Sequence, residues 1–116
     1  MNISEFMRKR NQAHANFKCL MPEVADNFDQ LMNIIFEDGA LSQQTKELIA
    51  LGVSVTIRCE PCMHYHSEKA IKKGATKEQV LEAMAVGYEM GVGQLVPPIR
   101  NVLADIFKDS DGGFNS

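Results

Sequence analysis

The spacing of residues that punctuate helices is the feature that most constrains how this chain folds. Prolines and glycines that can begin or end a helix are separated by intervals as long as helices, and the residues within those intervals favour helix. No internal repeat or low-complexity segment is present, and 116 residues suffice for one domain but not for two. The sequence therefore predicts one domain over residues 1–116, with its core at about 20–108 and a flexible polar tail at 109–116. The residues that divide the chain in this way are Pro22, Gly39, Gly74, Pro97–Pro98 and Gly112–Gly113.

Helix signals recur along the chain. After a polar first segment at about 4–17, apolar residues recur three and four positions apart from Pro22 to Gly39, as on an amphipathic helix. Ser42 is a plausible N-cap for the third segment, and Gly74 follows a fourth segment at about 61–73. A fifth opens at the capping box Thr76–Gln79, and a sixth follows Pro97–Pro98.

Two segments leave alternatives open. Residues 53–57 continue a run that alternates apolar and small residues, which is typical of a strand but also fits a buried helix with small packing residues. Residues 80–92 are apolar on nearly every face, so a helix there must be buried on every face. In so small a domain, this indicates either a central helix or a subunit interface.

Composition narrows the classes of function. The net charge of −3 argues against a nucleic-acid partner, and no apolar run is long enough to span a bilayer. The first ten residues lack a signal-peptide core, so we expect a cytoplasmic protein without a membrane partner. Three cysteines are too few and odd in number for a secreted disulfide scaffold. Cys19 stands alone, and we expect it to be a small core residue.

Cys59 and Cys62 carry the chemistry that the sequence suggests. Three positions apart at the start of a helix, they can close a disulfide with little movement. The helix N-terminus stabilises a thiolate, which is the reactive form. His66 lies one turn after Cys62 and could accept its proton, whereas His64 points elsewhere and is expected at the surface or a pocket rim. The structural alternative is a zinc site with Cys19 or His64 as the fourth ligand.

These residues resemble the alkylhydroperoxidase D-like proteins, a branch of the carboxymuconolactone decarboxylase family. That family carries a glutamate, eleven residues, a CxxC pair, three residues and a histidine. Glu47, Cys59, Cys62 and His66 stand at these positions here, and the resemblance extends over about residues 41–91.

The resemblance implies an all-α fold of about six helices, including residues 53–57, and assembly into homo-oligomers, commonly trimers or hexamers. It implies a dithiol–disulfide cycle on Cys59 and Cys62 that reduces a small-molecule peroxide or disulfide, with a thiol reductant protein as a further partner. Glu47 and His66 would form a proton relay, Cys62 would be the nucleophile and Cys59 would resolve it; attack by Cys59 first is the alternative. No cofactor and no resident metal are expected.

The chain departs from the family at one position. Pro61 stands where well-known peroxidase-active members have a histidine, and proline cannot relay a proton. This counts against efficient peroxidase turnover rather than against the fold or the redox pair. Members that decarboxylate carboxymuconolactone generally lack the CxxC pair, so its presence argues against that reaction.

Two other functions remain open. A strand at residues 53–57 followed by Cys-Glu-Pro-Cys and a helix would fit a thioredoxin-like disulfide oxidoreductase, although no second strand is evident. A helical oligomer whose thiols only sense redox state or bind metal is the non-enzymatic alternative.

Overall fold

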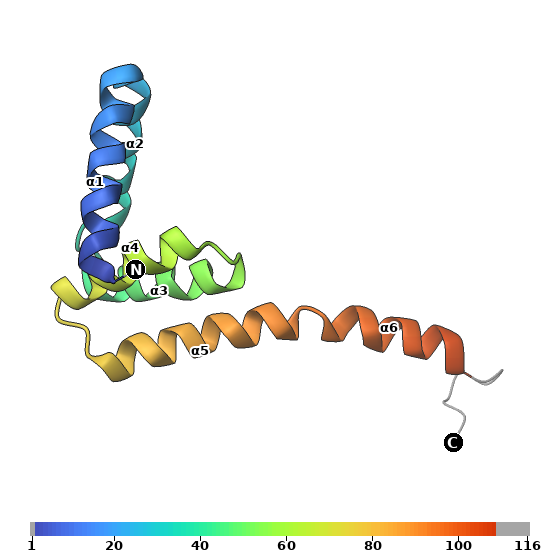
Figure 1. The fold of residues 1–116 in the computed structure, drawn as a ribbon. Helices are drawn as coiled ribbons and strands as arrows, with labels where there is room; N and C mark the ends of the chain where they lie inside the picture. Colours follow the sequence, from blue (N-terminus) through green and yellow to red (C-terminus); the bar gives the residue numbers. More distant parts are fainter. Residues whose placement is uncertain (1, 109–116) are drawn as a thin grey trace.

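The computed structural model describes residues 2–108, which form six α-helices and no β-strand within that range (Figure 1). The all-α prediction is confirmed, and the thioredoxin-like alternative is wrong because its sheet is missing from the described residues. The predicted tail at 109–116 lies outside them. The helices are α1 (Ile3–Leu20), α2 (Pro22–Phe36), α3 (Gln43–Thr56), α4 (Glu60–Lys72), α5 (Lys77–Gly93) and α6 (Val96–Phe107).

The helices form a small body with two projections (Figure 1). α3 packs against both α4 and α5 and is the centre of that body. α1 and α2 form an antiparallel hairpin that stands away from it, and α6 continues beyond the end of α5 in the other direction. The chain is therefore elongated, with extents of 65 × 34 × 33 Å.

Residues 53–56 are helical, so the strand-like interpretation of the alternating run is wrong. The small residues of the run serve close helix packing. Gly52 lies against α5, where a Cβ atom would come within 3.2 Å of the Ala83 carbonyl oxygen. The Thr56 hydroxyl donates to the Gly87 carbonyl oxygen of α5 at 2.9 Å, and the Ser54 hydroxyl donates to Ala50 at 2.6 Å within α3. Helical spacing places these groups where α3 meets its neighbours.

The helix ends follow their local signals. The Ser42 side chain caps α3 by accepting the Thr45 N–H. Thr76 and Gln79 form the predicted capping box at the start of α5. Gly74 adopts a φ of +93° after α4, in the left-handed region that favours glycine. α6 begins at Val96, so Pro97 and Pro98 lie in its first turn, where a missing N–H costs no helical bond.

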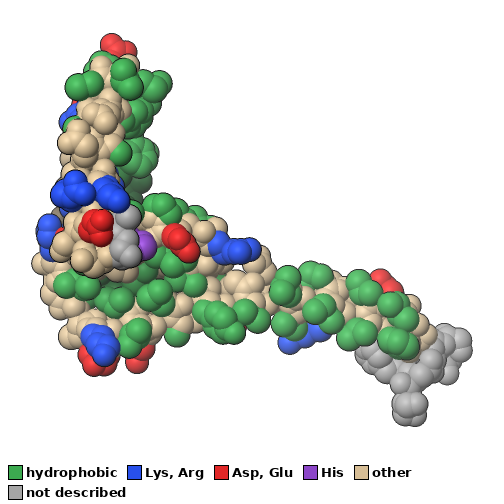
Figure 2. Space-filling view, in the orientation of Figure 1, with side chains coloured by type: hydrophobic (Ala, Val, Ile, Leu, Met, Phe, Trp, Pro, Cys, Tyr) green, Lys and Arg blue, Asp and Glu red, His purple; other side chains and the backbone are tan. Residues whose placement is uncertain are grey.

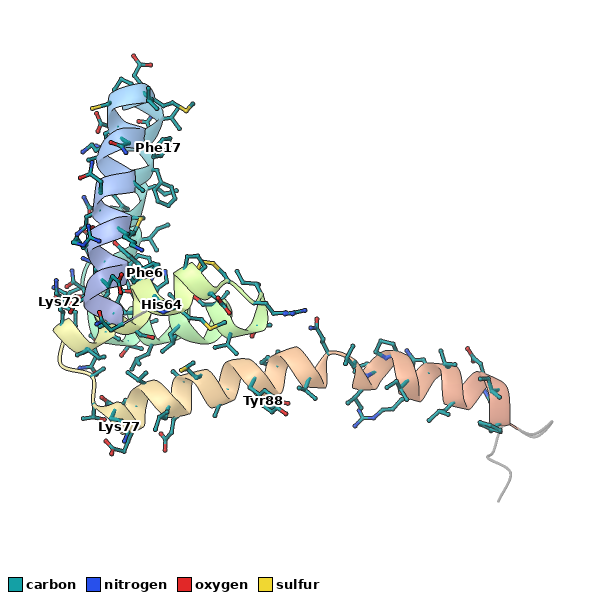
Figure 3. The ribbon with its side chains drawn as sticks, viewed as in Figure 1. Phe6, Phe17, His64, Lys72, Lys77 and Tyr88 are labelled. Atoms are coloured by element: carbon teal, nitrogen blue, oxygen red, sulfur yellow. A yellow bond between two sulfur atoms is a disulfide. The ribbon has the colours of Figure 1, made fainter. Side chains whose placement is uncertain are left out.

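Little of the apolar surface is buried within the described chain (Figure 2). Leu51 is the one large side chain there that is fully buried. α5 is not the central helix that its composition allowed, because Val86 is 64% exposed and Tyr88, 67% exposed, points away from α3 (Figure 3). Cys19 was expected in the core and is exposed instead, since it lies in the last turn of α1, beside the turn into α2. No helix among residues 2–108 is long and apolar enough to cross a membrane.

A methyl group added between α3 and α5 should destabilise the contact between these two helices. A Cβ atom at position 87 would overlap the carbonyl oxygen of Gly52 and approach the Val55 Cβ at 2.9 Å. We expect Gly87→Ala to lower the free energy of unfolding by about 1–3 kcal/mol, as overpacking does. Urea denaturation followed by circular dichroism measures this change in the free energy of unfolding.

Gly91→Ala is the matched control for this substitution. Its Cβ would lie 3.8 Å from the nearest atom, the Cα of Thr56, which is ordinary contact. We expect it to be neutral or to stabilise the helix by up to about 1 kcal/mol. Equal effects at the two positions would contradict this account of the contact.

Candidate active site

The turn between α3 and α4 places the two cysteines at the N-terminus of a helix. Arg58 adopts a φ of +61°, a left-handed conformation that bends the chain sharply after α3. The Cys59 N–H then donates to the Ser54 carbonyl oxygen at 2.9 Å, which ties the turn back to α3. Cys59 is the N-cap of α4, and Pro61 lies in the first turn, where proline is tolerated.

Cys59 and Cys62 are joined in a disulfide, with their Cα atoms 5.2 Å apart (Figure 3). The Cys62 N–H donates to the Cys59 sulfur at 3.2 Å. Both residues are partly exposed. When the bond is reduced, the same N–H and the positive end of the helix dipole are in place to stabilise a Cys59 thiolate.

Glu47 and His66 form a close pair between α3 and α4. The Nδ1–H of His66 donates to Oε2 of Glu47 at 2.7 Å. Glu47 is only 7% exposed, and the His66 side chain is 17% exposed. A carboxylate can only accept this bond, so it holds the proton on Nδ1 and leaves the lone pair on Nε2.

Aromatic rings fix the orientation of His66. Phe36 of α2 stacks on the imidazole with centroids 5.5 Å apart, and Tyr65 meets it edge-on at 5.1 Å. The Arg10 guanidinium of α1 lies 4.5 Å from the Tyr65 ring centroid, and the Lys69 ammonium lies 5.4 Å from it. The hairpin of α1 and α2 therefore contacts the surroundings of the Glu47–His66 pair through one aromatic and one cationic side chain.

Burial raises the pKa of the Tyr65 phenol above its usual value, and the Arg10 charge offsets part of that rise. The hydroxyl therefore stays protonated at neutral pH. Tyr65 also borders a small cavity of about 200 Å³ beside the pair, with Glu47 on its wall and Lys69 and Lys73 among its lining residues.

Of the four predicted site residues, the structure joins Cys59 to Cys62 and Glu47 to His66. His66 lies one turn after Cys62 in α4, on the same face of that helix. His64 lies apart from these pairs: it stacks on Phe6 of α1 with centroids 4.7 Å apart, and its Nδ1–H donates to the Glu60 carbonyl oxygen (Figure 3). Among residues 2–108, no group of three or more His, Cys, Asp or Glu side chains is arranged to hold a metal.

The sequence did not point to Phe36, Tyr65 or Arg10 as parts of the site. Phe36 stands at the end of the apolar stripe of α2 and looks like a core residue. Tyr65 had one available signal, its place directly before His66, but its contacts with Arg10 depend on how α1 packs on α4. These contacts join segments far apart in the sequence, and no local pattern encodes them.

This arrangement can support thiol–disulfide chemistry. It combines two sulfurs joined in one disulfide, a helix N-terminus that favours thiolate, and an imidazole whose tautomer is set by a buried carboxylate. The fold and the site thus define a class of protein: an all-helical protein with a CxxC disulfide and a carboxylate–imidazole pair.

Comparison with known proteins identifies the family. The chain matches the Carboxymuconolactone decarboxylase family over residues 22–104, and it belongs to that family. An uncharacterized protein from the cox locus of Paracoccus denitrificans is 37% identical over 89 residues, 77% of this chain and 79% of that protein. Alkyl hydroperoxide reductase AhpD of Corynebacterium kroppenstedtii is 38% identical over 66 residues, 56% of this chain and 37% of that protein.

Solved structures of members of this family are similar to the fold of this chain. A carboxymuconolactone decarboxylase family protein from Legionella pneumophila, in its apo form, superimposes with a TM-score of 0.72 at 33% identity and covers 84% of this chain and 88% of that one. A family member from Thermotoga maritima gives a TM-score of 0.64 at 27% identity, covering 84% and 82%. The family match begins at α2, so α1 and its Arg10 lie outside it.

A double-mutant cycle should detect the Glu47–His66 hydrogen bond as coupling energy. Glu47→Ala leaves a largely buried Nδ1–H without its acceptor, which costs about 1–3 kcal/mol of stability. Once His66→Ala has removed that donor, the same Glu47→Ala change should cost much less. Urea unfolding of the four proteins gives the coupling, and a value near zero would contradict the buried pair.

Proposed function

We propose that the chain is a thiol-dependent oxidoreductase that cycles between the Cys59–Cys62 disulfide and the dithiol. The observation that carries this proposal is the buried 2.7 Å pair of Glu47 and His66, placed one helical turn beyond a disulfide-bonded cysteine. A structural disulfide needs no such pair. A nucleophilic thiol does, because a base must take its proton and a second group must hold that base in the right tautomer.

In the oxidative half of the cycle, Cys62 acts as the nucleophile. Nε2 of His66 accepts the Cys62 proton, and Glu47 stabilises the resulting imidazolium. With a peroxide, the thiolate attacks one oxygen, the O–O bond breaks, and the second oxygen leaves as an alcohol or water after taking a proton. Cys62 is then a sulfenic acid, and the Cys59 thiol displaces its oxygen as water to form the disulfide. The two electrons taken up by the peroxide come from the two thiols.

The reductive half uses the N-cap position of Cys59. A dithiol reductant attacks the Cys62 sulfur, and Cys59 leaves as a thiolate. The Cys62 N–H that already points at the Cys59 sulfur stabilises this leaving group, and a better-stabilised thiolate leaves faster. The second thiol of the reductant then releases Cys62 and takes the disulfide away.

The substrate is a small peroxide or disulfide. Membership of a family with an alkyl hydroperoxide reductase among its relatives supports a peroxide, and the Thermotoga maritima relative has been suggested to take part in an antioxidative response. Pro61 offers no side-chain proton donor beside Cys62, so we expect slower peroxide turnover than in relatives with histidine at that place. Disulfide exchange needs no such donor.

A non-enzymatic redox sensor would use the same two sulfurs without turning over. The test is steady consumption of hydrogen peroxide, or of a small disulfide, with dithiothreitol as the reductant. Continued turnover over many equivalents supports the enzyme. A single stoichiometric oxidation with each substrate would contradict it and favour the sensor.

The two cysteines should differ in what their replacement does. Cys62→Ser should abolish oxidation by peroxide, because the nucleophile is gone. Cys59→Ser should still be oxidised once, leaving a Cys62 sulfenic acid that dimedone traps and mass spectrometry detects. Cys19→Ser, the matched control at the exposed third cysteine, should behave as wild type. Sulfenic acid on Cys59 in the Cys62→Ser protein would reverse the order of attack.

Removal of either relay residue should slow turnover without loss of helix. We expect His66→Ala to lose about 100-fold in the rate of thiol oxidation, the usual range for a general base. Glu47→Gln keeps an acceptor for the Nδ1–H but loses the charge that stabilises an imidazolium, so we expect a loss of about 10-fold or more. Circular dichroism and stopped-flow kinetics measure both effects.

Glu82→Gln, on the exposed surface of α5, is the control for charge removal and should leave the rate unchanged. Wild-type rates in Glu47→Gln would show that Glu47 is a structural residue only.

A further inference from the structure

Two cavities adjoin in the angle that the α1–α2 hairpin makes with α4 (Figure 1). The smaller, of about 200 Å³, is the one beside the Glu47–His66 pair. The larger, of about 230 Å³, reaches further along the hairpin. Both are lined by Met32, Asn33 and Tyr65, so one ligand can occupy the two together. The residues that line the larger cavity are Arg10, His14, Asp29, Met32, Asn33 and Tyr65.

Three cationic side chains line these cavities without a counter-ion. Arg10 lines the larger cavity, and Lys69 and Lys73 line the smaller. None of the three forms an ion pair with a carboxylate among residues 2–108. Arg10 and Lys69 are partly buried and both lie against the Tyr65 ring. Positive charge that is partly withdrawn from water and unpaired favours the binding of an anion.

The two carboxylates on the walls are already engaged by other groups. Glu47 accepts the N–H of His66. Asp29 lies 2.8 Å from Nε2 of His14 and 3.4 Å from the Lys18 ammonium. The hydrogen bond from His14 holds the pKa of the Asp29 carboxyl below its usual value. Neither carboxylate is therefore paired with the three cations.

The smaller cavity also has an apolar wall that leads towards the cysteines. Met32 and Phe36 line it, and Phe36 stacks on His66. Lys69 lies two turns after Cys62 on the same face of α4, about 10 Å further along the helix axis. A ligand whose anionic end meets Lys69 can thus extend along the apolar wall towards the Cys62 sulfur.

We propose that these cavities bind the carboxylate of the substrate, so that the enzyme prefers peroxides or disulfides that carry a carboxylate on an apolar chain. Arg10 and Lys69 are the residues that determine this preference, since a guanidinium and an ammonium both donate to carboxylate oxygens. The Asn33 amide, on the wall of both cavities, offers a further donor. Arg10 belongs to α1, outside the family match, so the family pattern does not include this site. The reaction in this proposal rests on the proposed function, whereas the binding of a carboxylate does not.

Binding is tested on the oxidised protein, where no turnover occurs. Hexanoate and hexanamide, which share one apolar chain, are titrated into the protein and followed by the NMR shifts of the Tyr65 and Lys69 amides. We expect hexanoate to bind about 10-fold more tightly, the effect of one hydrogen bond to a charged group. Lys69→Gln should reduce this preference several-fold, and adding Arg10→Gln should remove it.

Lys77→Gln, at the start of α5, is the matched control and should keep the full preference (Figure 3). Equal affinity for the acid and the amide in the wild type would overturn the proposal, and so would an unchanged preference in the double variant.

Selection of the substrate is tested by turnover with dithiothreitol as the reductant. Dithiodioctanoate is a disulfide with a carboxylate at the end of each chain, and its diamide is the neutral counterpart. We expect kcat/KM to be about 10-fold higher for the acid, and the two values to become equal in the Arg10→Gln/Lys69→Gln variant. Equal values in an active wild type would overturn the substrate preference. No turnover of either disulfide would contradict the proposed function and not the carboxylate site, which the titration decides.

Discussion

The close approach of α3 to two neighbours at once is the constraint on which the rest of the molecule depends. Towards α5, Gly52 and Gly87 remove the side chains that would keep the two backbones apart. On another face of α3, Glu47, Leu51 and Ser54 form a buried stripe at spacings of four and three residues. Glu47 binds His66 of α4, and Ser54 accepts the N–H of Cys59 through its backbone. One helix thereby sets both the body of the fold and the positions of the Cys59–Cys62 and Glu47–His66 pairs.

Much of this follows from local signals in the sequence. The capping box at Thr76, the N-cap at Ser42 and the glycine at position 74 mark helix ends because each satisfies backbone groups within a few residues. The CxxC pair likewise needs only its own helix N-terminus. Glu47 is different: on its own it resembles a surface carboxylate, and only its register with Cys59 in the family pattern distinguished it.

What the sequence could not settle depends on contacts between distant segments. The alternation in residues 53–57 looks like a strand because Gly52, Ser54 and Thr56 alternate with larger residues, yet those small residues are the ones that face neighbouring helices and the α3 backbone. Phe36 and Tyr65 orient His66 only because the hairpin folds against α4. The apolar composition of α5 was consistent with burial or an interface, and its side chains are largely exposed in the single chain.

The account rests most directly on the claim that one cysteine of the pair is an activated thiol. The decisive measurement is the pH dependence of alkylation of the reduced, chelator-treated protein, resolved for Cys59 and Cys62 by mass spectrometry. An unperturbed cysteine has a pKa of about 8.5. The account predicts that one of the two reacts at clearly lower pH than Cys19 in the same protein, and that mild peroxide then joins the pair in an intramolecular disulfide. If both react like Cys19, or react only after the chelator has removed a metal, the redox function is contradicted and only the fold assignment stands.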